Sequence, residues 1–138
     1  MHDKTVDELK TTLDSIYYRI EREAEVRDDG FEKYESPVPP AMVEAAKKWI
    51  YQFGCACWQC ELPLLIPEMN RNGDGIELTW ESAAPEHCLN RYVILIDANP
   101  VGVCDSGHVL HGPCDWFDPA DLITATTHYQ GFLAARKA

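Results

Sequence analysis

Apolar residues recur at helical spacing in three parts of this chain. The first stripe, within residues 5–27, advances by four, three and four positions: Leu9, Leu13, Ile16 and Ile20. Such spacing places the side chains on one face of an α-helix. A second helix is predicted over residues 41–53, with Gly54 ending it. A third begins at Asp118, which can cap the first turn ahead of Pro119.

Between the second and third helices the pattern changes to that of strands. Residues 76–81 alternate apolar and polar positions, as a strand with one buried face does, whereas residues 92–96 are apolar throughout. We expect the second of these strands to be central, covered on both faces or on one face and by an interface. Residues 60–69 contain two prolines and fit only an edge strand, and residues 101–104 predict a short fourth strand.

Short turns join these strands, so neighbouring strands should pair antiparallel. The predicted order is α-α-β-β-β-β-α. The helices must bury their apolar faces on the sheet, which gives a two-layer α+β fold. The 138 residues are enough for one domain. Residues 31–40 are rich in proline and are expected to form an extended linker between the first two helices.

The charge of the chain is strongly negative and unevenly spread. The net charge is −11 at pH 7, and between residues 49 and 135 only Arg71 and Arg91 are basic, against eleven acidic residues. A protein that binds nucleic acid directly needs Lys and Arg to displace counterions from the phosphates, so we do not expect this activity. An acidic surface suits a partner with a basic surface, or it serves solubility alone.

Neither a membrane span nor a secretion signal is predicted. No stretch approaches the roughly 18 apolar residues that a spanning helix requires. Residues 1–4 lead into a polar helical pattern rather than the apolar core of a signal peptide. We therefore expect a cytoplasmic protein without a membrane partner, whose six cysteines are not joined in disulfides.

One segment has the residue types of a zinc site. Two cysteines and two histidines fall within eleven positions: Cys104, His108, His111 and Cys114. Thiolate and imidazole are donors that tetrahedral zinc prefers, and nearby glycines would let the loop bend around the ion. The alternative is a loop whose thiols act as small apolar residues without a metal.

A second cluster of thiols consists of Cys55, Cys57 and Cys60. It supplies three of four zinc ligands, and the fourth would have to come from another segment, such as His87 or Cys88. Cys57 and Cys60 also have redox spacing, but they follow a predicted helix end, whereas reactive thiols of this type precede a helix. The competing interpretation is that all three are buried apolar residues.

Two tryptophans and three aspartates are candidate partner-binding residues: Trp58, Trp116, Asp105, Asp115 and Asp118. Exposed tryptophan anchors many protein interfaces, and carboxylates would meet a basic partner. Residues 9–20 could also pair two copies of the chain, although two heptads are too few for a coiled coil on their own.

The middle half of the chain resembles a group of proteins. The matching segments are Pro67 and residues 37–40 (PVPP), 45–50 (AAKKWI), 73–80 (GDGIELTW) and 97–100 (DANP). They resemble small uncharacterised bacterial and phage proteins, in which a proline-led helix precedes a glycine-rich hairpin that ends in tryptophan. The resemblance implies no enzymatic activity. The cysteines and histidines of this chain depart from that pattern.

A catalytic role is not expected, because no spacing supports a nucleophile with its base or a phosphate-binding loop. The sequence predicts a non-catalytic interaction module whose acidic surface docks on a basic partner. It would act as an accessory subunit or inhibitor, for instance of a nucleic-acid-binding complex. The alternative is a zinc-stabilised domain with its ligands between residues 104 and 114.

Overall fold

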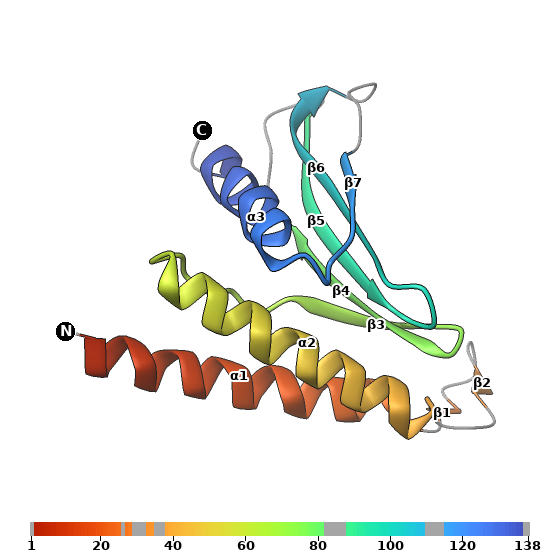
Figure 1. Cartoon of the computed structure of the whole chain (residues 1–138). Coiled ribbons are helices and arrows are strands. Elements are labelled where there is room, and N and C mark those ends of the chain that lie inside the picture. The colour runs from red at the N-terminus through yellow and green to blue at the C-terminus, as the bar shows by residue number, and fades with distance from the viewer. Residues whose placement is uncertain are drawn as a thin grey trace.

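The computed structural model describes residues 2–25, 27–28, 33–34, 38–81, 88–109 and 115–136. Three helices pack on one face of an antiparallel sheet, so the predicted two-layer α+β fold is confirmed (Figure 1). The helices are α1 (His2–Ala24), α2 (Pro40–Gln59) and α3 (Leu122–Arg136). Among the described helices, none combines the length and the apolar character that crossing a membrane requires.

The sheet is a simple meander in which each strand pairs with the next one along the chain. Its strands are β3 (Glu68–Asn72), β4 (Gly75–Glu81), β5 (Cys88–Ile96), β6 (Val101–Val109) and β7 (Asp115–Phe117). Strand β7 is a fifth strand that the sequence pattern did not predict, and β6 continues well beyond the predicted end at residue 104. Strands β5 and β6 pair with each other as far as Cys88 and Val109, so both strands are longer than predicted.

The hairpin between β3 and β4 follows from its glycines. Asn72 pairs with Gly75, which leaves a two-residue loop of Gly73 and Asp74. Gly73 has a φ of 60°, and within the described residues Glu61 is the one non-glycine residue with a positive φ, so Asp74 has a negative one. A positive φ at the first loop position alone is the type II′ turn, whose twist matches that of the flanking strands.

Residues 31–40 were predicted to be an extended linker, and the described part of this segment is more structured. Strand β1 (Arg27–Asp28) pairs antiparallel with β2 (Lys33–Tyr34) as a small separate sheet. The backbone N–H of Val38 then donates to the carbonyl oxygen of Ala24 at 2.9 Å, which ties the end of the segment to the end of α1. Helix α2 begins at Pro40, one residue before its predicted start, and proline fits this first helical position because it has no N–H to leave unpaired.

The predicted end of the second helix at Gly54 is wrong, because α2 continues to Gln59. Gly54 is buried where α1 crosses α2, and a Cβ at this position would lie 3.1 Å from Leu64 and 3.2 Å from Leu13. Glycine therefore serves close packing here rather than helix termination. The helix ends instead at Gln59, and Glu61, two residues further along the chain, has a φ of 58°.

The predicted edge strand over residues 60–69 begins only at Glu68, after the two prolines. The preceding segment is held by side chains instead of a β ladder. The Tyr129 hydroxyl donates to the carbonyl oxygen of Pro63 at 2.7 Å and accepts from the backbone N–H of Leu65 at 3.0 Å. Trp80 Nε1 donates to the carbonyl oxygen of Leu65 at 2.7 Å. These bonds satisfy backbone groups that have no partner strand in this segment, because proline cannot donate to a β ladder.

The cap of α3 is also displaced from its predicted position. The N-cap is Asp121, whose carboxylate accepts from the backbone N–H of Thr124 at 3.3 Å and from its hydroxyl at 2.8 Å. These bonds from Thr124 lower the pKa of Asp121. Asp118 shapes the preceding turn by accepting from the backbone N–H of Ala120 at 2.9 Å.

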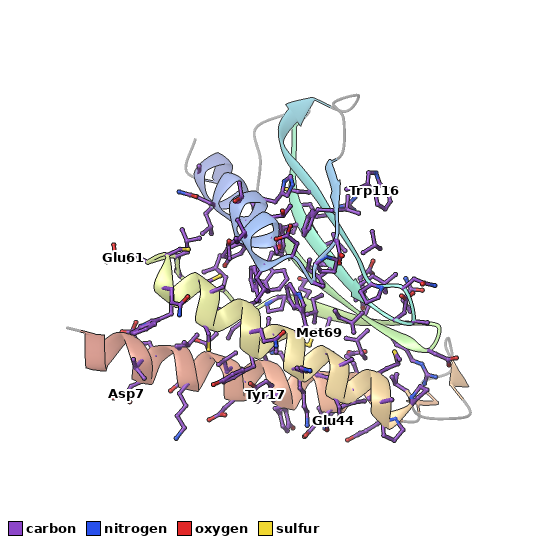
Figure 2. All side chains as sticks on the ribbon, in the orientation of Figure 1. Asp7, Tyr17, Glu44, Glu61, Met69 and Trp116 are labelled. Carbon is purple, nitrogen blue, oxygen red and sulfur yellow. The ribbon has the colours of Figure 1, made fainter. Side chains whose placement is uncertain are left out.

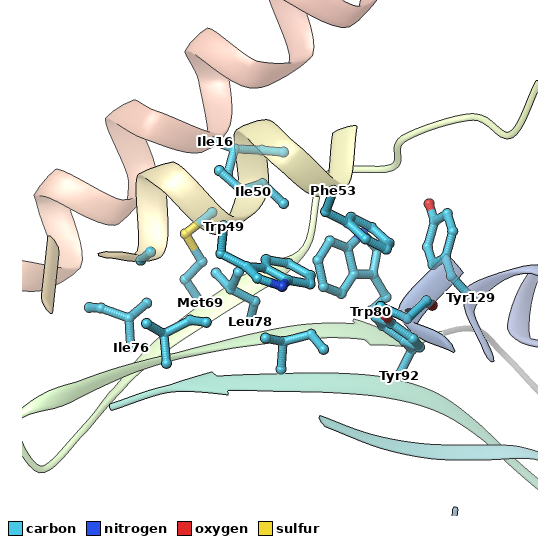
Figure 3. Close-up of a cluster of buried hydrophobic side chains, with 14 of the residues drawn as sticks. Ile16, Trp49, Ile50, Phe53, Met69, Ile76, Leu78, Trp80, Tyr92 and Tyr129 are labelled. Atoms are coloured by element: carbon cyan, nitrogen blue, oxygen red, sulfur yellow. Dashed lines mark hydrogen bonds between the residues drawn. The ribbon is translucent and has the colours of Figure 1, made fainter. Parts of the chain in front are cut away.

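Aromatic rings form the centre of the core between the helices and the sheet (Figure 3). Phe53 of α2 stacks on Trp49 at a centroid distance of 4.7 Å and meets Tyr129 of α3 edge-on at 5.1 Å. Trp80 and Tyr92, on neighbouring strands, pack edge-to-face at 5.5 Å. This aromatic cluster fixes the helical layer against a single face of the sheet.

Candidate interaction surface

The opposite face of the sheet is not covered by any helix of the described chain (Figure 1). Side chains alternate along each strand, and those facing the helices include the buried Ile76, Leu78 and Ile94. The intervening residues of the central strands face outward. Four of them are apolar and half-buried: Val93, Leu95, Val101 and Val103. An apolar patch therefore lies at the centre of an open sheet.

The strand register joins this patch into two continuous rows. Thr79 pairs with Val93, Val93 with Val103, and Val103 with Trp116. In the next row Glu77 pairs with Leu95, which pairs with Val101. We name the uncovered face the open sheet face and define it by these residues together with the carboxylates beside them, Glu68 and Glu81, which are exposed on β3 and β4.

Trp116 lies at the β7 edge of the open sheet face, with 67% of its surface exposed. Figure 2 shows its side chain directed away from the helices. Its neighbour Phe117 points inward, where its ring stacks on His128 of α3 at 4.7 Å. The carbonyl oxygen of Pro119 accepts from Trp49 Nε1 at 2.7 Å. The chain on one side of Trp116 is thus anchored in the core, while the indole ring faces solvent.

The charge beside the open sheet face is mainly acidic. Glu68 pairs with Thr79, and Glu77 and Glu81 lie on the outward side of β4. Arg91 is exposed at the outward position between Glu81 and Asp105 in the register. Asp118 is exposed just after β7. Of the other predicted partner-binding residues, Asp115 pairs with Cys104, and the side chains of Asp105 and Asp115 lie outside the described residues.

The structure brings no three of the described His, Cys, Asp and Glu side chains together as metal ligands. Cys104 is buried, and its thiol donates to the carbonyl oxygen of His128 at 3.6 Å. His108 is four residues further along the same strand, so about 13 Å separates the two backbones. His111 and Cys114 lie outside the described residues, as does the His108 side chain. Zinc binding between residues 104 and 114 stays a prediction.

The second cysteine cluster lies at the C-terminal end of α2. Cys57 is fully buried, Cys55 is partly exposed and Cys60 is exposed. Burial, together with the nearby Cys60 thiol, raises the pKa of Cys57 to about 12. A thiol with such a pKa is neutral at physiological pH and is a poor nucleophile. Cys57 packs in the core, and metal binding by Cys55, Cys57 and Cys60 stays a prediction.

Trp58, the other predicted anchor, is half-buried where α1 and α2 run side by side. It lines a hollow of about 410 Å³ between the two helices, together with Leu9 and Tyr17 of α1 and Tyr51 of α2. Burial raises the pKa of Tyr17, and the nearby Tyr51, Asp14 and Cys55 raise it further. This hollow is mainly apolar, with polar groups gathered near Tyr17.

The sequence pattern did not identify the valines and leucine of the open sheet face as site residues. The available signal was the uninterrupted apolar run at residues 92–96, which indicated that both faces of that strand have to be covered. The structure covers one face with helices and leaves the other one open.

Comparison with known proteins identifies no family for this chain. No protein-family model matches it, and no curated protein or solved structure matches it either.

Proposed function

We propose that this protein is a non-catalytic interaction module that binds a basic protein through its open sheet face. The observation that carries the proposal is the apolar centre of that face, formed by Val93, Leu95, Val101 and Val103 with Trp116 at its edge. Interfaces combine such an apolar centre with a polar rim, and tryptophan is among their most frequent energetic anchors.

The charges favour one class of partner. Glu68, Glu77 and Glu81 lie beside the apolar centre, and Asp118 follows Trp116 along the chain. Residues 49–135, which include the whole five-stranded sheet, contain eleven acidic residues and only two basic ones. Complementary charge speeds association and disfavours acidic partners. A partner that presents lysines or arginines around an apolar contact fits this face, and the protein would act on it as an accessory subunit or inhibitor.

The proposal can be tested with a defined probe. A synthetic amphipathic peptide with alternating lysine and leucine residues is titrated into the isotopically labelled protein, and amide chemical shifts are recorded. We expect the shifts to change on β4, β5, β6 and at the Trp116 indole, and the affinity to fall as salt is added. A peptide with glutamate in place of lysine should not bind.

Matched variants locate the contact. Trp116→Ala should weaken peptide binding, whereas Ile123→Ala removes an apolar side chain that is 81% exposed on α3 and should leave binding unchanged. Val103→Asp places a charge at the centre of the face and should abolish binding. Shift changes confined to the helices, or equal effects of Trp116→Ala and Ile123→Ala, would contradict the proposal.

A further inference from the structure

One side of α1 carries apolar and charged residues toward solvent beside the hollow with α2. Successive residues of a helix are rotated by about 100°, which places six side chains of residues 6–18 within about 120° of one another. They are Val6, Asp7, Lys10, Asp14, Tyr17 and Tyr18. Val6 is 44% exposed and Tyr18 is 61% exposed, while Asp7, Lys10 and Asp14 are exposed and Tyr17 is half-buried. We call this side of the helix the α1 outer face.

This face does not belong to the apolar stripe that the sequence pattern offered for self-association over residues 9–20. Leu13, Ile16 and Ile20 of that stripe are buried in the core of the chain, at 6%, 0% and 0% exposure. They pack on α2 and the sheet and are not accessible to a second copy. Any pairing through this part of α1 must use the side chains that the fold leaves outside.

The α1 outer face is complementary to itself when it is read in reverse. In an antiparallel pair centred level with residue 12, Lys10 of each copy lies opposite Asp14 of the other. The same symmetry places Val6 opposite Tyr18 and Asp7 opposite Tyr17. An apolar residue thus meets an aromatic ring, a carboxylate meets a phenol hydroxyl, and an ammonium meets a carboxylate. A twofold interface requires this kind of self-complementarity.

The charged side chains of Lys10 and Asp14 on α1 are exposed and can pair with a second helix. Among the described residues, neither Lys10 nor Asp14 forms an ion pair with another side chain of the chain. Within one helix, lysine four residues before an acidic residue is the weaker orientation for pairing. Lys47 of α2, by contrast, already pairs with Glu21 near the other end of α1.

The overall charge distribution also favours a second copy on this side of the molecule. Residues 1–48, which include α1, carry twelve acidic and eight basic residues, whereas residues 49–135 carry eleven and two. Two copies that approached through their sheets would bring the most acidic halves together. Approach through α1 brings together the more balanced halves, where opposite charges can pair.

We propose that two copies of this chain associate through the α1 outer face, antiparallel and related by a twofold axis level with residue 12. A stable interface buries about 800 Å² on each partner. Helix α1 is about 35 Å long, and Tyr51 of α2, which is 56% exposed beside the hollow, extends the contact. The open sheet faces point away from this interface, so the dimer presents two of them.

Charge exchange tests the pairing directly. Sedimentation equilibrium of the full chain over a range of concentrations gives the dissociation constant of the dimer. Lys10→Glu places two carboxylates opposite each other across the axis, and Asp14→Lys places two ammonium groups opposite each other. Each single variant should therefore weaken the dimer by about tenfold or more. The double variant restores opposite charges across the axis and should recover the dissociation constant of the original protein.

Controls separate association from folding. Lys48→Glu changes an exposed lysine of α2 outside the α1 outer face by the same charge and should leave the dissociation constant unchanged. Tyr18→Ala removes an exposed ring without altering charge and should weaken the dimer while leaving the circular dichroism spectrum intact. A monomeric chain at millimolar concentration, or losses that add rather than cancel in the double variant, would overturn the proposal. Peptide binding by the open sheet face is independent of either result.

Discussion

Gly102 of β6 lies directly opposite Phe117 of β7, and a Cβ added to Gly102 would come within 2.4 Å of two carbons of the Phe117 ring. The ring is buried across β6 and stacks on His128. Because side chains alternate along a strand, the inward position of Phe117 sends its neighbour Trp116 outward. Because Gly102 has no side chain, the Phe117 ring can lie across β6, and this inward ring fixes Trp116 on the outer side of β7.

Gly102→Ala should destabilise the protein by about 1–3 kcal/mol, because the added methyl group overlaps a buried ring that is held on its other side by His128. Gly131→Ala is the matched control. Gly131 is an exposed glycine of α3 with nothing within 4 Å of an added Cβ. Alanine there should stabilise the protein by about 0.5–1 kcal/mol through helix propensity. Urea unfolding of both variants measures the opposite signs, and equal effects would refute the overlap.

Glu61→Gly should stabilise the protein by about 1 kcal/mol. Glu61 has a φ of 58° just after the end of α2. The N–H of Glu61 donates to the carbonyl oxygen of Trp58 and that of Leu62 to the carbonyl oxygen of Cys57, which is the Schellman arrangement. Glycine adopts this conformation without the cost that a Cβ imposes. Glu61→Ala keeps the Cβ and should gain little, so the difference between the two melting temperatures is decisive.

The stability of the protein should fall as the pH rises above about 9. Burial raises the pKa of Cys57 from 9.0 to about 12, so the unfolded chain loses this proton at a lower pH than the folded one. Below pH 9 both states keep the proton and the contribution is complete. Between pH 9 and 12 it declines by about 1.4 kcal/mol for each pH unit.

Urea unfolding between pH 8 and 11 measures this decline, and Cys57→Ala supplies the reference. Tyr92 is also buried, and its raised pKa adds a further loss in both proteins once the pH rises above about 10, where a tyrosine of the unfolded chain ionises. The original protein should therefore lose stability with pH more steeply than Cys57→Ala. Identical slopes would show that Cys57 ionises in the folded chain as easily as in the unfolded one.

The zinc hypothesis can be separated from a structural role of Cys104. Cys104→Ser should lower stability in either case, because the thiol is buried against the carbonyl oxygen of His128. A zinc site requires in addition that Cys114→Ser does the same, that a chelator lowers the melting temperature, and that about one zinc ion accompanies each chain. Mass spectrometry of the metal content after purification in reducing buffer is the measurement. Loss of stability in Cys104→Ser alone, without metal, would dismiss the site.

The pattern of apolar residues determined the fold class and most of the elements. The apolar stripe of α1 has the period of a helix, and the alternation in residues 76–81 has the period of a strand. Both elements have the predicted type of secondary structure. Where packing overrode local preference, the prediction was wrong. Gly54 lies inside α2, where the side chains of α1 pack closely against it. Strand β3 begins only after Pro63 and Pro67, because proline cannot donate to a β ladder.

The sequence by itself determined three helices, an antiparallel sheet and an acidic half, because periodicity, turn chemistry and charge are properties of neighbouring residues. Only the tertiary structure decided which surfaces stay uncovered. All three helices pack on one face of the sheet, which leaves Val93, Val103 and Trp116 outside and buries Cys57 and Cys104. Exposure depends on contacts between residues far apart in the chain, such as Trp49 with Pro119, and no local pattern contains that information.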